Sequence, residues 1–381
     1  MSQLNVRNLS NENDDGSPEI VGVSTFSATS FFVPPKGSTA ERPSDCEPGS
    51  IRFNTDTANL EYFRGKTLGW SQFELVTPNL GGGTGSNTGL GIRGLFAGGF
   101  ISPTGTARTN IIDFITISTL GNAQDFGDRT HVSDTCAGAA SKTRGVIAGG
   151  YAGSETNVIE FVTISSLGDA LDFGDLPSNR RNRDGCGDTV RGLFGGGYPF
   201  SAQIDYITFE SLGNAIDFGD LTQTRYNSGA LSSSTRAVFA GGNASPTSPV
   251  SDVIDFVTIR TTGNATDFGD LTGTGTGGFS GTSNSTRGLI GISNSNSIEF
   301  ITIATTGNAT DFGDATYNLG AHAAAGSPTR AVFAGGGASP APLTNSMDFV
   351  EILTTGNGLD FGDLTDGRQS LAGFSNGHGG L

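Results

Sequence analysis

The sequence predicts an all-β protein in which one four-stranded unit is repeated six times and closed into a ring. The tetrapeptide Asp-Phe-Gly-Asp recurs at intervals of 47, 45, 50, 44 and 49 residues. An arginine-led motif that ends in glycines keeps the same spacing. No window has the 3.6-residue apolar period of an amphipathic helix. A motif that returns at such intervals indicates one structural unit copied around an array. The tetrapeptides begin at Asp125, Asp172, Asp217, Asp267, Asp311 and Asp360.

Each repeat contains four segments that predict short strands. The arginine-led segment, such as Arg144-Gly-Val-Ile-Ala-Gly-Gly, is followed by a β-branched and aromatic segment, such as Val158-Ile-Glu-Phe-Val-Thr-Ile. A Gly-Asn turn then leads to Asp-Phe-Gly-Asp, in which the phenylalanine anchors a further strand. A looser stretch precedes the next arginine. Four strands every ~45 residues match one blade of a β-propeller, so we expect a six-bladed propeller.

The two ends of the repeat region predict how the ring closes. A glycine-rich stretch, and no strand, precedes the first arginine-led segment at Arg93. The chain instead ends with a surplus segment that begins at Arg368 and matches the segment that begins at Arg225. We therefore expect the C-terminal strand to complete the first blade and to remove the open edges of the ring.

The N-terminal part of the chain has a different composition. We expect an extended arm over residues 1–48, a small β-meander over 49–80, a Gly-rich linker over 81–88 and the propeller over 89–381. The meander is too short to form an independent core, and the arm carries short apolar segments. Both features predict contact with another chain. The expected partner-binding residues of the arm are Ile20, Val21, Phe26, Phe31, Phe32 and Pro34.

Composition argues against several classes of function. The net charge is −16, and no cluster of Lys and Arg matches a groove for nucleic acid. Three cysteines do not make a disulfide framework, and no apolar run has the length of a transmembrane span or signal sequence. We expect no nucleic-acid partner and no membrane insertion.

The repeated acids predict architecture, because a catalytic pair consists of two particular carboxylates in different environments. We expect no catalytic residue, no metal and no cofactor. The repeated Asp side chains are expected to cap turns or to pair with the repeated arginines. A ring of acids around a cation at the axis is the alternative. Cys136, Cys186 and His322 are aligned at one position of the repeat, where axis packing is preferred to metal binding.

The loops that differ between repeats are the candidates for recognition. They follow the glycine pairs and are expected to leave one face of the ring, where proline and aromatic tips make stiff contact points. The candidate residues are Tyr198, Pro199, Phe200, Pro246, Pro249, Pro340 and Pro342.

Two resemblances follow from these motifs. The repeat resembles a kelch repeat, with Gly149-Gly150 ending the second strand, Phe161 in the third and Phe173, in place of the usual Trp, in the fourth. The segments 32–43, 49–57 and 60–65, with Trp70, resemble phage tail-fibre and other virion proteins, and the repeats resemble those of marine cyanobacterial phages.

The resemblances imply a non-enzymatic virion structural protein, a tail or fibre component made in the host cytoplasm and carried in several copies on the particle. The arm would dock to other virion proteins, and the kelch-like propeller would be displayed, with a host cell-surface glycan or protein as its partner. Two alternatives stay open. One is a glycan-binding or glycan-degrading virion component, and the other is an intracellular kelch-type interaction scaffold.

Overall fold

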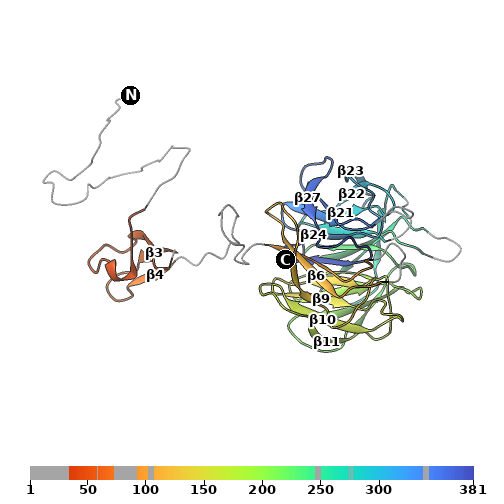
Figure 1. The fold of residues 1–381 in the computed structure, drawn as a ribbon, viewed down its shortest axis with the longest axis horizontal. Helices are drawn as coiled ribbons and strands as arrows, with labels where there is room; N and C mark the ends of the chain where they lie inside the picture. The colour runs from red at the N-terminus through yellow and green to blue at the C-terminus, as the bar shows by residue number, and fades with distance from the viewer. Residues whose placement is uncertain are drawn as a thin grey trace, which may run out of the picture. The chain divides into compact units, whose positions relative to one another are not determined.

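The structure is a computed structural model, which describes residues 34–57, 59–72, 92–101, 107–244, 250–273, 275, 278–337 and 343–381. The chain divides into two compact units, Met1–Thr77 and Pro78–Leu381 (Figure 1). The described residues form an all-β fold of seven four-stranded sheets and one short 3-10 helix, Thr39–Glu41. No helix among the described residues has the length and apolar character needed to cross a membrane.

The first unit contains one sheet in the order β1-β2-β3-β4. β2, β3 and β4 form the expected antiparallel meander, and β1 adds a fourth strand that runs parallel to β2. Pro34, at the start of the described chain, is half-buried, whereas Ile20, Val21, Phe26, Phe31 and Phe32 lie outside the described residues. The strands are β1 (Lys36–Gly37), β2 (Ile51–Asn54), β3 (Asn59–Phe63) and β4 (Trp70–Gln72).

A buried cluster of charged side chains stabilises this small sheet. The sequence predicted only that the meander is too short to form an independent core. Glu61 is fully buried and lies 2.6 Å from Arg42 and 3.4 Å from Arg52. The Asn54 amide donates a further hydrogen bond to Glu61. Burial alone would raise the pKa of Glu61, but hydrogen bonds from Arg42 and Asn54 lower it below its usual value.

The second unit consists of six antiparallel sheets, which we call repeat sheets 1 to 6. Each contains strands of four, five, six and five residues in that order. Repeat sheet 1 is β28 (Ala372–Ser375), β5 (Arg93–Ala97), β6 (Ile111–Thr116) and β7 (Gln124–Asp128); sheet 2 is β8 (Ala137–Ala140), β9 (Arg144–Ala148), β10 (Val158–Thr163) and β11 (Leu171–Asp175); sheet 3 is β12 (Asp184–Gly187), β13 (Arg191–Gly195), β14 (Gln203–Thr208) and β15 (Ile216–Asp220). Sheet 4 is β16 (Gly229–Ser232), β17 (Arg236–Ala240), β18 (Val253–Thr258) and β19 (Thr266–Asp270); sheet 5 is β20 (Ser280–Ser283), β21 (Arg287–Gly291), β22 (Ser297–Thr302) and β23 (Thr310–Asp314); sheet 6 is β24 (Ala323–Gly326), β25 (Arg330–Ala334), β26 (Ser346–Glu351) and β27 (Leu359–Asp363).

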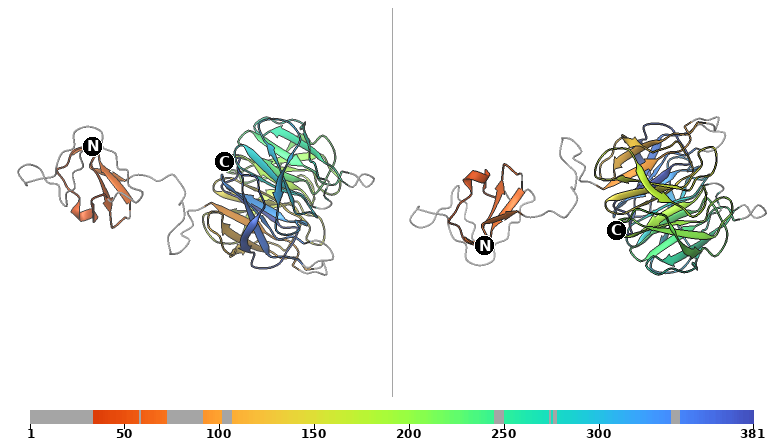
Figure 2. Two further views of the ribbon diagram at one scale, coloured as in Figure 1. Left: turned by 90° about the horizontal axis from the view of Figure 1, so that it is seen from above. Right: turned by 90° about the horizontal axis from the view of Figure 1, so that it is seen from below.

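The first strands of the repeat sheets contact one another in a closed cycle. β8 contacts β12, and the contacts continue through β16, β20, β24 and β28 back to β8. Figure 2 shows the strands of the second unit from two further sides. β28 comes from the end of the chain and pairs antiparallel with β5, the first strand of the repeat region. This is the pairing that the surplus C-terminal segment predicts, and it leaves repeat sheet 1 with the same four strands as the others.

The repeated glycines explain how neighbouring sheets fit together. In each interface the turn of one sheet, Gly-Asn in five sheets and Gly168-Asp169 in repeat sheet 2, lies against the Asp-Phe-Gly-Asp strand of the sheet before it. Gly213 N–H donates to Phe173 O, and Ala215 N–H donates to Asp175 O, both at 2.8 Å. The Asn214 side chain accepts from Asp175 N–H at 3.0 Å. A methyl group on Gly174 would lie 2.5 Å from the Gly213 backbone, so this approach requires glycine.

The repeated arginines cross the same interfaces, and their partners correct one expectation. Arg144 donates to Phe209 O of the next sheet at 2.6 Å, and its guanidinium lies 4.9 Å from the Phe161 ring. The equivalent arginines of the other five sheets also donate to a backbone carbonyl and stack on an aromatic ring. The expected pairing with the Asp-Phe-Gly-Asp carboxylates is wrong, because the first Asp of each copy is exposed on the outer strand.

Candidate functional site

A second set of acids, on the third strand of each repeat sheet, is buried and held by the framework. These carboxylates are at most 1% exposed: Asp113, Glu160, Asp205, Asp255, Glu299 and Asp348. Four of them meet a buried arginine from the stretch that precedes the first strand: Arg368 for Asp113, Arg129 for Glu160, Arg183 for Asp205 and Arg225 for Asp255. Sequence analysis missed these arginines, because Arg129, Arg183 and Arg225 do not occupy one fixed position relative to Asp-Phe-Gly-Asp.

Among the described residues, the acids of the two remaining sheets have no arginine partner. Glu299 accepts from the backbone and hydroxyl of Thr272, and Asp348 does the same with Thr316. Burial raises the pKa of Asp348. The pKa of Glu160 is lowered to about 2, because hydrogen bonds from His131 and Thr130 and the positive charge of Arg129 outweigh the effect of burial. Donors from the framework therefore hold all six acids in place.

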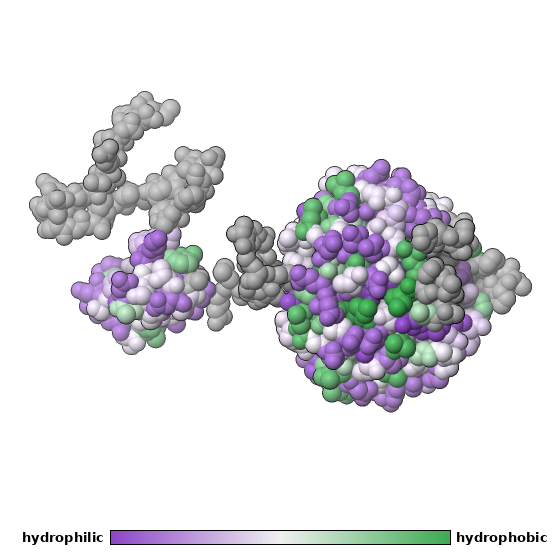
Figure 3. Space-filling model, in the orientation of Figure 1, coloured by the Kyte–Doolittle hydropathy of each residue, from purple (hydrophilic) through white to green (hydrophobic). Residues whose placement is uncertain are grey.

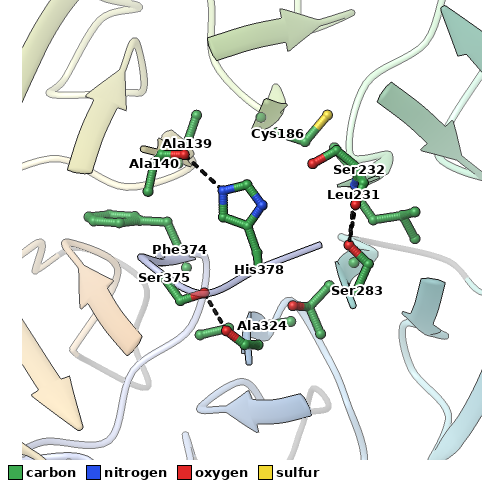
Figure 4. Close-up of a pocket in the computed structure, with 18 residues that line it drawn as sticks. Ala139, Ala140, Cys186, Leu231, Ser232, Ser283, Ala324, Phe374, Ser375 and His378 are labelled. Carbon is green, nitrogen blue, oxygen red and sulfur yellow. Dashed lines mark hydrogen bonds between the residues drawn. The ribbon is translucent and has the colours of Figure 1, made fainter. Parts of the chain in front are cut away.

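The axis of the second unit is closed at one end by the C-terminal tail. His378 lies in the middle of the ring of first strands, and its Nε2 lies 2.8 Å from Ala140 O (Figure 4). Gly380 N–H donates to His378 Nδ1, so the neutral ring carries its proton on Nε2. A methyl group on Gly379 would lie 2.0 Å from Asn284 O, and one on Gly380 would lie 1.9 Å from Gly187 O. The tail thus fills this end of the axis tightly.

The other end of the axis opens into a cavity of about 170 Å³, which we call the mouth cavity. Backbone hydrogen bonds run around it from sheet to sheet. Asn227 N–H donates to Asn182 O, Asn182 N–H to Thr135 O, Thr135 N–H to Ser370 O and Ser370 N–H to Ala321 O, at 2.7 to 2.9 Å. All five residues have positive φ, between 51° and 61°. Asn tolerates this region better than most residues, which accounts for Asn182 and Asn227.

One carboxylate of the mouth cavity has no counterpart in the other sheets. Asp184 is half-buried, at a register position that holds Ala137, Gly229, Ser280, Ala323 or Ala372 elsewhere. Its Oδ1 accepts from Gly185 N–H and its Oδ2 from Ala230 N–H of the next sheet, both at 2.8 Å. Burial raises the pKa of Asp184 to about 7, although the two backbone donors act in the opposite direction.

A row of aromatic rings and guanidinium groups lies beside the mouth cavity, and we call it the aromatic–arginine row. Arg108 lies 5.0 Å from the Phe100 ring and 4.6 Å from the Tyr151 ring. Arg181 lies 4.6 Å from Tyr151 and 4.8 Å from Tyr198. The row ends in a cluster of Tyr198, Phe200 and Tyr226, with ring centres 5.0 to 6.1 Å apart. Its members are half-buried.

The row adjoins the mouth cavity because some of its residues directly precede cavity-lining residues in the sequence. Arg181 and Tyr226 directly precede Asn182 and Asn227, and Asp134, which lies 2.7 Å from Arg108, precedes Thr135. The structure thus brings Tyr198 and Phe200 to this site, with the exposed Pro199 between them. The other candidate residues, Pro246, Pro249, Pro340 and Pro342, lie outside the described residues. Sequence analysis missed Asp184 and the row, because the contributing residues are scattered over four repeats.

The alignment of Cys136, Cys186 and His322 at one repeat position is confirmed for Cys136 and His322, which each directly precede a first strand, and is wrong for Cys186. Arg183 holds the position of Cys136, while Cys186 lies within β12, opposite Leu193. The His322 Nδ1 lies 2.9 Å from Leu319 O, and its Nε2 faces Gly291 in the interface between two sheets. Among the described residues, no group of three or more His, Cys, Asp or Glu side chains could hold a metal ion.

The chemistry of the site is that of polar recognition. The mouth cavity offers amide, hydroxyl and carboxylate groups, and the row beside it offers half-buried rings. No protein-family model matches the sequence, and no curated protein is significantly similar to it.

Proposed function

We propose that the chain is a non-enzymatic structural protein of a phage particle, a tail or fibre component that displays a recognition module. The observation that supports this proposal is a contrast between two sets of side chains. One set recurs in the repeat sheets, and the other set, around the mouth cavity, differs from sheet to sheet. The buried acids and the arginines that recur in the sheets are occupied by structural contacts. The side chains that differ between sheets gather at the mouth cavity, where a displayed binding module would meet its partner.

The finer description of the fold is part of this proposal. We regard the six repeat sheets as the blades of a kelch-like β-propeller closed by β28. The closed cycle of contacts between first strands supports this description. So does the aromatic pair that each sheet repeats, such as Phe161 and Phe173 at 6.1 Å.

Exposed apolar side chains on the outer rim support assembly with other chains. Leu120, Leu167 and Leu212 occupy the turns of repeat sheets 1 to 3 and are 54 to 59% exposed. Repeat sheet 6, which contacts sheet 1, exposes Leu353 and Leu359 by 65% and 62%, whereas the same turns of sheets 4 and 5 carry Thr262 and Thr306. Figure 3 shows small apolar patches among polar side chains on one face of the second unit. Apolar groups gathered on one part of a surface indicate a region that a partner covers.

Immunogold electron microscopy of purified particles, with antibodies against the whole chain, tests the assignment. We expect label on the tail or its fibres. Recovery of the protein only from the soluble fraction of infected cells would overturn the proposal and favour an interaction scaffold. Incubation with host envelope polysaccharide tests the non-enzymatic part, since new reducing ends would reveal a glycan-degrading component.

A further inference from the structure

The sixfold repeat is broken most clearly at the mouth cavity, which makes its chemistry informative. A residue present in all six sheets builds the sheet, whereas a residue present in one sheet serves a local purpose. Asp184 is the only carboxylate at its register position, where the other sheets place small side chains. The aromatic–arginine row likewise belongs to one side of the rim. On the other side of the rim, the backbone hydrogen bond that corresponds to the one between Tyr198 and Arg181 joins Gly337 and Gly320.

The lining of the mouth cavity fits a ligand with many hydroxyl groups. Asp184 has further lone pairs beyond the two backbone N–H groups that it accepts. The side chains of Asn182 and Asn227 form a hydrogen bond with each other at 2.5 Å and retain further donor and acceptor capacity. Ser228 lines the cavity, is 1% exposed and has a hydroxyl oxygen without a hydrogen-bond partner among the described residues. An unpartnered buried hydroxyl indicates a missing polar partner.

The charges around the cavity favour a neutral ligand. Arg108 lies 2.7 Å from Asp134, Arg181 lies 3.5 Å from Glu155, and Arg183 lies 2.6 Å from Asp205. Arg180 donates to Ser178 and Gln203. Three of these four arginines are thus paired with an acid, namely Asp134, Glu155 or Asp205. Asp184 is the acid that lines the cavity, and in its ionised form it would repel a sulfate, phosphate or carboxylate group.

The aromatic–arginine row supplies the apolar ring surface that a sugar can contact. Two guanidinium groups, of Arg108 and Arg181, each lie 4.6 Å from the centre of the Tyr151 ring, so this ring is held in place. The cluster of Tyr198, Phe200 and Tyr226 ends the row with half-buried rings whose remaining surface can contact C–H groups of a sugar. Large rigid rings of this kind provide contact area at little cost in conformational entropy.

We propose that the mouth cavity binds a terminal residue of a neutral saccharide, with Asp184, Asn182, Asn227 and Ser228 contacting its hydroxyl groups and the ring cluster packing against its C–H face. The inference rests on the proposed function, since it names the chemical class that the displayed module recognises. It predicts that the cavity binds a neutral sugar and does not bind an anionic one.

Isothermal titration and saturation-transfer NMR with the full chain test this proposal. The probes are maltotriose, mannotriose, galactobiose and N-acetylchitotriose, with tri-galacturonate as the anionic counterpart. We expect saturable binding of at least one neutral probe and none of tri-galacturonate. Asp184→Ala and Tyr198→Ala should each weaken that binding at least tenfold. Tri-galacturonate binding as tightly as the neutral sugars, or no binding of any neutral probe, would overturn the proposal.

Two controls separate binding from folding. Asp184→Ala installs the residue that repeat sheets 1, 2 and 6 carry at this position, so the fold should accept it. Asp217→Asn removes an exposed acid of the outer strand and should leave the affinity unchanged. A folded Asp184→Ala protein with full affinity would overturn the assignment. If the chain is found on the particle but binds no neutral sugar, this inference alone is refuted. If the chain binds a neutral sugar but is absent from the particle, only the virion proposal is refuted.

Discussion

Arg225 Nη2 lies 2.8 Å from Asp255 Oδ2, and both side chains are fully buried. Removing one partner leaves the other charge without compensation in the interior. We expect Arg225→Met to lower the free energy of unfolding by roughly 3–5 kcal/mol. Denaturant unfolding measures this change in the second unit. It is followed by far-ultraviolet circular dichroism, a signal that does not depend on tryptophan.

Repeat sheet 6 provides the matched control. Asp348 occupies the place of Asp255 but is held by Thr316 and has no arginine partner. We expect Asp348→Asn to cost only about 1 kcal/mol, because the variant removes a carboxylate whose pKa burial already raises and strands no buried cation. Equal losses for Asp348→Asn and Asp255→Asn would contradict the view that the ion pair determines the larger effect.

The sequence sufficed for the repeat, the strands and the pairing of the last strand with the first, because these depend on local patterns and on spacing. It did not suffice for the ion pairs or the site. The partner of Asp113 is Arg368, more than 250 positions later in the chain, and no local rule connects them. The aromatic–arginine row arises because Tyr151, Arg181 and Tyr198 meet at adjacent sheets, although each appears as an ordinary loop residue. The repeated arginines were assigned the wrong partner, since sequence alone cannot reveal a backbone carbonyl of the next sheet.

The glycine contact between sheets gives a second prediction. Gly174 and Gly213 have φ of 146° and 145°, so alanine is strained at either position. Only at Gly174 would the methyl group also meet backbone, 2.5 Å from Gly213, whereas nothing lies within 4 Å of the same group at Gly213. We expect Gly174→Ala to be the more destabilising variant by roughly 1–3 kcal/mol, measured by denaturant unfolding. Equal losses would show that backbone strain, and not the contact between sheets, explains the repeated glycine.

Removal of the C-terminal strand gives a third prediction. Deletion of residues 369–381 removes β28 with its buried Phe374, and also the buried Leu371 that precedes it, and leaves the edge of β5 unpaired. Loss of two such side chains costs several kcal/mol, so the thermal midpoint should fall by about 10 °C or more. Deletion of residues 377–381 alone keeps β28 and removes only the tail that fills the axis, so a smaller fall is expected. Unchanged melting of the longer deletion in differential scanning calorimetry would refute closure by β28.

The pH dependence of stability isolates Asp184. Its pKa of about 7 in the folded protein lies above the ordinary value of 3.8, so the folded state favours the protonated carboxyl. The associated stability is complete below pH 3.8 and is lost as the pH rises through about 7. Asp184→Ala removes this dependence, and the variant should therefore gain stability relative to the natural chain between pH 5 and pH 8. At about 1.4 kcal/mol for each pKa unit, the gain amounts to a few kcal/mol at most. His378 acts in the opposite direction, because burial lowers its pKa and its contribution is lost as the pH falls, but it is present in both proteins and cancels from the difference. Thermal midpoints of the two proteins measured at intervals of half a pH unit give this difference directly, and parallel curves from pH 5 to pH 8 would exclude a buried, proton-binding Asp184 at the mouth cavity.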